Sequence, residues 1–193
     1  MGHKHWNRGR KREAGARFLS GGLKRNTRAD APLTLSRRAA VVGEENATDQ
    51  RAGTALGIAL FVGALGHYNA RAMGESARNA NADALRRWFA GTLFSRAHRR
   101  WTRIEAIPPR AVMQPCGGRG LVEDPAPEFA ARVVRDWSNA TEALSSAGLC
   151  AYRVVDDVAI TDTLPGDLLR PGSASAENLR RGLDALADFF QVG

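Results

Sequence analysis

Positive charge is concentrated at the start of this 193-residue chain, and this limits which part of it can build a core. Residues 1–38 carry eleven Lys or Arg and two acidic residues, a net charge of +9, whereas the net charge of the whole chain is +8. A segment dense in like charge and in glycine repels itself and has too little apolar surface to offset the entropy lost on folding. We therefore predict a disordered basic arm over residues 1–38 and a packed core in the remainder.

The composition favours a helical domain after the arm. The chain is 44% apolar and 25% charged, but only 7% aromatic, and it is rich in alanine. Strands draw on β-branched and aromatic residues, whereas alanine favours helices. We expect residues 39–51 to form a polar linker and residues 52–193 to form a single all-α domain, a helical bundle of about five helices.

Apolar residues recur at spacings of three and four after residue 52, which indicates amphipathic helices. Leu56, Leu60 and Ala64 mark a buried helix, although its four glycines weaken it in isolation and require close packing against a partner. The polar, alanine-rich stretch from Tyr68 to about Asn81 can also be helical. The expected helices cover residues 52–66, 83–103, 129–144, 149–161 and 176–190.

Polar residues, prolines and glycines predict where these helices begin and end. Asp83 and Ser175 are candidate N-caps, because short polar side chains accept hydrogen bonds from the first turn of a helix. Two prolines at positions 108 and 109 end the second helix, and Gly148 ends the third. Residues 114–127 are expected to form a loop.

Two of these segments have alternative interpretations. Residues 149–161 could instead contain a strand over residues 154–160, but the apolar spacing favours a helix. Residues 52–66 are continuously apolar or small, yet they fall short of the roughly 20 residues that a membrane span needs. We therefore expect a buried core helix there and no membrane span.

A second basic region follows in the middle of the chain, where residues 85–110 have a net charge of +6. At 3.6 residues per turn, one stripe of this helix is aromatic and aliphatic, which favours packing in the core over stacking with bases. That stripe contains Leu85, Trp88, Phe89, Leu93 and Ala97. The arginines on the other side are predicted to be available to phosphates: Arg86, Arg96, Arg99, Arg100 and Arg103.

Both basic regions indicate a nucleic-acid partner, and we expect DNA in preference to RNA. Lysine and arginine neutralise phosphates and release condensed counterions whatever the base sequence, and arginine also makes bidentate phosphate contacts. A merely solubilising tail is the alternative. The candidate nucleic-acid-binding residues are Arg8, Arg10, Lys11, Arg12, Arg17, Lys24, Arg25, Arg28, Arg37, Arg38, Arg86, Arg96, Arg99, Arg100 and Arg103.

The sequence contains no arrangement of a nucleophile, a base and an orienting group, so we expect no enzymatic activity, no metal and no cofactor. His67 and His98 are isolated from other metal-ligand types. The glycine-rich run at residues 116–120 lacks the Lys-Ser/Thr of a phosphate loop. Asp156, Asp157 and Asp162 are better explained by a solvated helix face than by a metal site.

Cysteine usage and the N-terminus predict a cytoplasmic protein. Cys116 and Cys150 lie 34 residues apart, a spacing that indicates neither a zinc site nor a disulfide framework. No apolar segment of the kind found in secretory signals occurs before residue 52.

Several short strings resemble a family of phage proteins. The run GRKREAGAR followed by SGGLKR (residues 9–17 and 20–25) is similar to the openings of small uncharacterised proteins carried by phages and prophages of alphaproteobacteria. TALG at 54–57, IPPR at 107–110 and LRRGLDALADFF at 179–190 extend the resemblance, whereas residues 52–66 and 114–127 depart from it. The resemblance implies a mobile-element origin and DNA binding, because some of these proteins are likened to small terminase subunits or helix-turn-helix regulators.

Other functional interpretations remain open at this point. A helix-turn-helix could use residues 149–160 and 176–190, but its turn would be much too long, and residues 111–193 have a net charge of −5, which disfavours approach to DNA. The chain could instead be a homo-oligomer or a virion or packaging accessory whose arm docks on an acidic protein. An amphipathic protein bound to a membrane surface is the third possibility.

Overall fold

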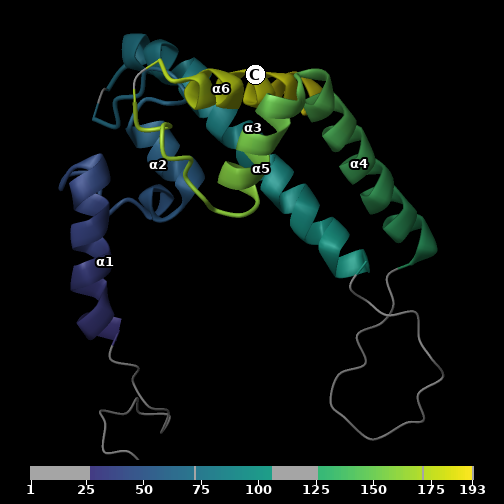
Figure 1. Ribbon diagram of the computed structural model, residues 1–193, viewed down its shortest axis with the longest axis horizontal. Coiled ribbons are helices and arrows are strands. Elements are labelled where there is room, and N and C mark those ends of the chain that lie inside the picture. The colour runs from purple at the N-terminus through teal and green to yellow at the C-terminus, as the bar shows by residue number, and fades with distance from the viewer. Residues whose placement is uncertain (1–26, 72, 106–125, 171, 193) are drawn as a thin grey trace, which may run out of the picture.

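The computed structural model describes residues 27–71, 73–105, 126–170 and 172–192, with side chains from residue 35 onward (Figure 1). These residues form six α-helices and one 3₁₀ helix and contain no strand, which confirms the all-α prediction. The elements are α1 (Thr27–Val42), η1 (Gln50–Gly53), α2 (Ala55–Phe61), α3 (Glu75–Glu105), α4 (Pro127–Ser146), α5 (Leu149–Ala159) and α6 (Ala174–Phe189).

The long helix α3 is the centre of the fold. It contacts α2, α4, α5 and α6, while α1 contacts only η1 and α2 among the described elements. Figure 1 shows α3 passing beneath α6, with α4 descending on one side and α1 standing apart on the other. Small residues allow the close crossings: a Cβ added at Gly91 would lie 2.9 Å from Leu56, and one added at Gly182 would lie 2.7 Å from Val155.

The core lies where α2, α3, α4, α5 and α6 meet and is built mainly from leucine and alanine. The apolar positions expected to face the core are buried at Leu56, Leu60 and Ala64 and, in the last helix, at Leu179, Leu183 and Leu186. Ala64 lies beyond the end of α2, and Phe190, expected on the same face as the three leucines, is only partly buried. The largest fully buried side chains are Phe94, Leu60, Leu65, Leu144, Leu168, Leu179, Leu183, Leu186, Val155 and Val158. No helix in the described ranges is both long enough and apolar enough to cross a membrane.

The predicted start of α3 is wrong. The helix begins at Glu75 and passes through Asp83, which is therefore not its N-cap. The extra turns are held by a tertiary contact: the amide of Asn81 donates to the Asn69 carbonyl (2.9 Å) and accepts from the Asn69 backbone N–H (2.9 Å). A polar residue buried in this way must be hydrogen-bonded, and helical backbone at Asn81 places the amide to do so.

The predicted core stripe of α3 is displaced around the helix. Phe89, expected in the core, has 49% of its surface exposed, whereas Phe94 is fully buried. The buried face of this part of the helix is formed by Ala84, Ala90, Gly91 and Phe94. It includes small residues because α2 and α6 approach α3 closely at Gly91, and such an approach cannot be recognised from hydrophobicity alone.

Three other boundaries differ from the predictions. Helix α1 crosses the expected limit of the arm at residue 38 and includes the first residues of the expected linker. The expected helix over residues 52–66 is divided between η1 and α2, and the chain turns at Gly63, where φ is +78°. Helix α6 is capped by Ser173, whose hydroxyl accepts from the Ala176 N–H, and not by Ser175. The helical interpretation of residues 149–161 is confirmed by α5.

Candidate nucleic-acid interface and the adjacent pocket

Four arginines form one exposed face near the end of α3. Arg99, Arg100 and Arg103 lie three, four and seven positions after Arg96, so the four arginines fall within a sector of about 100° around the helix. All four are exposed, and none of them forms an ion pair with another described residue. We call this set the arginine face; it lies on the side of α3 opposite the buried Phe94.

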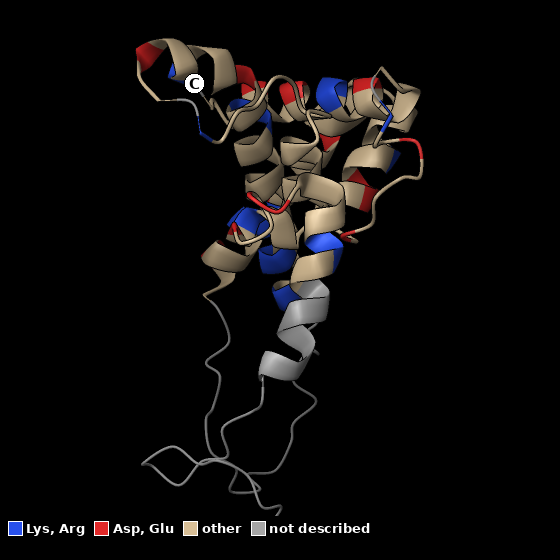
Figure 2. Ribbon diagram, turned by 90° about the vertical axis from the view of Figure 1, so that its left-hand side faces the viewer, with Lys and Arg blue, Asp and Glu red and all other residues tan. Residues whose placement is uncertain are grey.

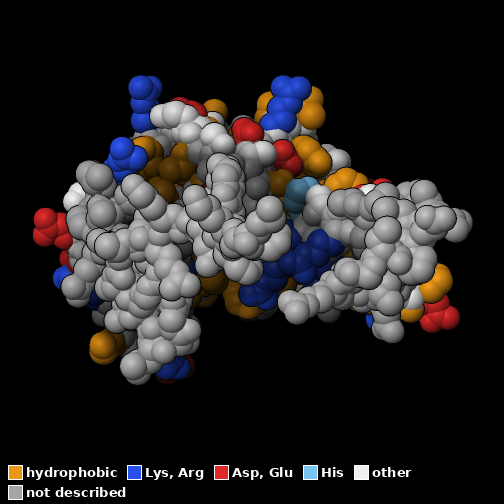
Figure 3. Space-filling view, turned by 90° about the horizontal axis from the view of Figure 1, so that it is seen from below, with side chains coloured by type: hydrophobic (Ala, Val, Ile, Leu, Met, Phe, Trp, Pro, Cys, Tyr) orange, Lys and Arg blue, Asp and Glu red, His pale blue; other side chains and the backbone are white. Residues whose placement is uncertain are grey.

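Most of α3 carries only positive charge. Between Asp83 and Glu105, this helix contains no acidic residue. Figure 2 shows Asp and Glu mixed with Lys and Arg along the top of the molecule, and several Lys and Arg positions on the lower helix segments. Seen from below in Figure 3, Lys and Arg side chains gather at the centre of the described surface, beside a histidine and apolar side chains.

Arg86 was predicted to be available to phosphates, and this prediction is wrong. Its guanidinium pairs with Asp188 and, at 3.5 Å, with Asp184, and its Nε donates to the Val192 carbonyl at 2.9 Å. Arg86 lies about 90° around the helix from the centre of the arginine face and points toward α6. Its neighbour Arg87 is similarly engaged, because its Nε donates to Asp184 at 2.8 Å and its Nη1 donates to the Leu65 carbonyl at 2.7 Å. These two arginines therefore fasten α6 to α3.

The remaining predicted residues lie apart from the arginine face. Arg37 and Arg38 belong to α1, which makes no contact with α3. Arg37 is exposed, and the Arg38 guanidinium packs against Gly53. Arg28 lies in α1, but its side chain is outside the description. Outside the described residues lie Arg8, Arg10, Lys11, Arg12, Arg17, Lys24 and Arg25.

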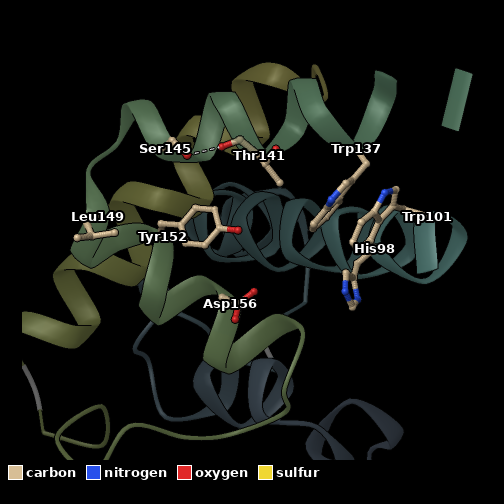
Figure 4. A pocket seen from close by; sticks show the side chains of 8 residues that line it. All are labelled: His98, Trp101, Trp137, Thr141, Ser145, Leu149, Tyr152 and Asp156. Atoms are coloured by element: carbon tan, nitrogen blue, oxygen red, sulfur yellow. Dashed lines mark hydrogen bonds between the residues drawn. The ribbon is translucent and has the colours of Figure 1, made fainter. Parts of the chain in front are cut away.

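A pocket of about 750 Å³ opens between α3, α4 and α5 (Figure 4). The Trp137 ring stacks between Phe94 and Trp101, with ring centroids 4.9 and 5.5 Å away, and forms the wall toward α3. We call this cavity the aromatic pocket. Its lining residues are His98, Trp101, Trp137, Thr141, Ser145, Leu149, Tyr152 and Asp156.

Sequence reasoning did not identify this pocket. The available signals were local ones: Trp137, Thr141 and Ser145 follow at spacings of four on α4, and Tyr152 and Asp156 do so on α5. These spacings place the residues of each helix on a common face, but they do not show that the two faces meet.

The aromatic pocket contains two acidic groups, the Asp156 carboxyl and the Tyr152 phenol, whose surroundings disfavour their ionised forms. Burial, followed by the charge of Asp157, raises the pKa of Asp156, and the neighbouring His98 opposes that rise. Burial and then the Asp156 charge raise the pKa of Tyr152. The Asp156 carboxylate and the Tyr152 phenol have no hydrogen bond to any side chain or backbone group that the structure describes. Within the described parts of the chain, no group of three or more His, Cys, Asp or Glu is placed to hold a metal ion.

Comparison of the chain with protein-family models, curated proteins and solved structures gave no match. The assignment of a function therefore depends on the arginine face and the aromatic pocket themselves. The resemblance to phage and prophage proteins stays a prediction, as does the helix-turn-helix alternative.

Proposed function

We propose that this protein is a non-enzymatic, phage-type DNA-binding protein that contacts the phosphate backbone through the arginine face and through its basic N-terminal segment. The observation that carries the proposal is the placement of Arg96, Arg99, Arg100 and Arg103 on one exposed side of α3 with no described acidic partner. A structural arginine is normally engaged, as Arg86 and Arg87 are, so four unengaged ones in register favour an external anion.

The arrangement suits a polyanion whose charges repeat along a line. Arginines three or four positions apart on this face advance along α3 by about 5 Å, so the face presents a row of positive charge that can contact several phosphates of one strand. Bidentate guanidinium–phosphate contacts need no particular base, so we expect binding with little sequence preference. The net charge of −5 over residues 111–193 would repel phosphates and so favour contact through the arginine face.

A second candidate is supported by a groove beside the arginine face. Its volume is about 440 Å³, and it places Arg96 and Arg100 next to the apolar side chains of Leu93, Val133 and Phe189. Phe189 is 37% exposed and contributes apolar surface to this groove. An acidic, partly apolar segment of a packaging protein would fit this combination, and the arginine face would then be a protein interface.

A salt titration with matched variants tests the proposal. Fluorescence anisotropy of a labelled duplex gives the affinity of the full chain at several salt concentrations. The double variant Arg99→Gln/Arg103→Gln should bind more weakly, and the slope of log K against log salt should become shallower by about 1.8, because each lost phosphate contact removes about 0.9. The control Arg170→Gln/Arg181→Gln removes two exposed arginines elsewhere and should leave the slope nearly unchanged.

Two results would contradict this function. Absence of any shift with DNA or RNA at low salt would reject nucleic-acid binding and favour the packaging candidate. An equal loss in the two double variants would show that general charge, and not the arginine face, determines the affinity.

A further inference from the structure

The aromatic pocket contains a negative charge and several aromatic rings but no arginine or lysine among its lining residues. In Figure 4, Tyr152 and Asp156 project from α5 toward the side where Trp137, Trp101 and His98 stand. Asp156 is half-buried, and its carboxylate has no described hydrogen-bond or ion-pair partner. A carboxylate kept in such a place without a partner indicates a ligand that supplies one.

The chemistry of the pocket selects a cation. Anions, phosphates among them, are disfavoured because Asp156 lines the site and Asp157 follows it on α5. Aromatic faces attract cations through their quadrupoles, and a cation would also relieve the desolvation of Asp156. A guanidinium fits better than an ammonium, because its planar form stacks on aromatic rings and donates two parallel hydrogen bonds to one carboxylate.

We propose that the aromatic pocket binds an arginine side chain from residues 1–26 of this same chain. These residues contain five arginines, three lysines and one acidic residue, so their charge is complementary to that of the pocket. Reach does not limit the contact, because 26 residues can extend to about 85 Å, whereas a domain of about 150 residues has a radius of gyration near 15 Å.

Occupancy of the pocket would hold the N-terminal segment away from nucleic acid. If that segment also contacts phosphates, DNA and the aromatic pocket compete for the same arginines, and the pocket lowers the affinity for weak or short polyanions. This competition rests on the proposed function, but the binding of the arginine in the pocket does not.

The test compares two full-length proteins by the NMR signals of their tryptophan indoles. In the arm-neutral chain, the three lysines and five arginines of residues 1–26 are replaced by Gln. The Trp101 and Trp137 signals should differ between the wild-type and arm-neutral chains, whereas the Trp88 signal, outside the pocket, should be the same. A synthetic peptide of residues 1–26 with Trp6→Phe, added to the arm-neutral chain, should return both signals toward their wild-type positions.

Two neighbouring carboxylates provide the matched control. In the arm-neutral background, Asp156→Asn should weaken the peptide about tenfold, as expected for the loss of a charge-assisted hydrogen bond. Asp157→Asn removes the same charge from an exposed adjacent position and should change the affinity by less than about twofold. A peptide in which all five arginines are glutamine should leave the indole signals unmoved.

Three outcomes would overturn the proposal. The first is identical Trp101 and Trp137 signals in the wild-type and arm-neutral chains. The second is equal weakening by Asp156→Asn and Asp157→Asn, which would indicate general electrostatic attraction. The third is displacement of the peptide by a neutral nucleoside such as cytidine at similar concentration, which would identify a base site. Failure of duplex DNA to displace the segment, with the peptide results intact, would count against the proposed function alone.

Discussion

The substitution Gly57→Ala should destabilise the fold through a clash with backbone that no side-chain movement can relieve. Gly57 lies in the first turn of α2, where η1 folds back against it. A Cβ at this position would overlap the carbonyl oxygen of Arg51 and lie too close to its carbonyl carbon. Relief therefore requires the backbone of η1 to move away from α2.

Such a movement would disturb the surroundings of Arg51. Its guanidinium pairs with Asp49 at 2.7 Å and lies 5.5 Å from the ring centroids of both Phe61 and Tyr68. Overpacking costs about 1–3 kcal/mol, and a backbone clash belongs at the upper end, about 3 kcal/mol. Alanine returns up to about 1 kcal/mol of helix propensity, so the net loss is about 2 kcal/mol.

Thermal unfolding followed by far-UV circular dichroism measures this loss. For a chain of this length, about 2 kcal/mol corresponds to a decrease in Tm of roughly 4–8 °C. Gly53→Ala is the matched control, because its Cβ would meet only the end of the flexible Arg38 side chain, and we expect a change within about 0.5 kcal/mol. A Gly57→Ala protein as stable as the wild type would refute the close approach of η1 to α2.

Two further predictions concern the packing of α3 and the aromatic pocket. Phe94→Ala should lower the free energy of unfolding in urea by about 3–5 kcal/mol, because a fully buried ring stacked on Trp137 is lost. Phe89→Ala, at an exposed position, should lower it by less than about 1 kcal/mol. Similar losses in the two variants would contradict the observed burial. Burial, followed by Asp157, raises the pKa of Asp156 above its unfolded value, so stability falls as the pH rises through that interval. In the arm-neutral chain, where no Lys or Arg of residues 1–26 can pair with this carboxylate, Asp156→Asn should therefore be more stable than its parent at neutral pH, and the difference should disappear below pH about 3. A less stable variant at neutral pH would contradict the desolvation of Asp156.

Local patterns in the sequence were enough to predict the helical class and the position of most helices. The spacing of Leu179, Leu183 and Leu186 predicted the buried face of α6, because one helical period relates these positions whatever they contact. The same period placed Arg96, Arg99, Arg100 and Arg103 on a common side of α3, and their exposure follows from the strong hydration of charged groups.

Only the tertiary structure decided which charged and aromatic residues are brought together. Arg86 resembles Arg96 in the sequence, yet its guanidinium is engaged by acidic residues about a hundred positions away in α6. The aromatic pocket likewise needs faces from α3, α4 and α5, and the first turns of α3 depend on the contact between Asn69 and Asn81. Helical periodicity is a property of neighbouring residues, whereas ion pairs, pockets and helix boundaries depend on how distant helices pack, which no local spacing specifies.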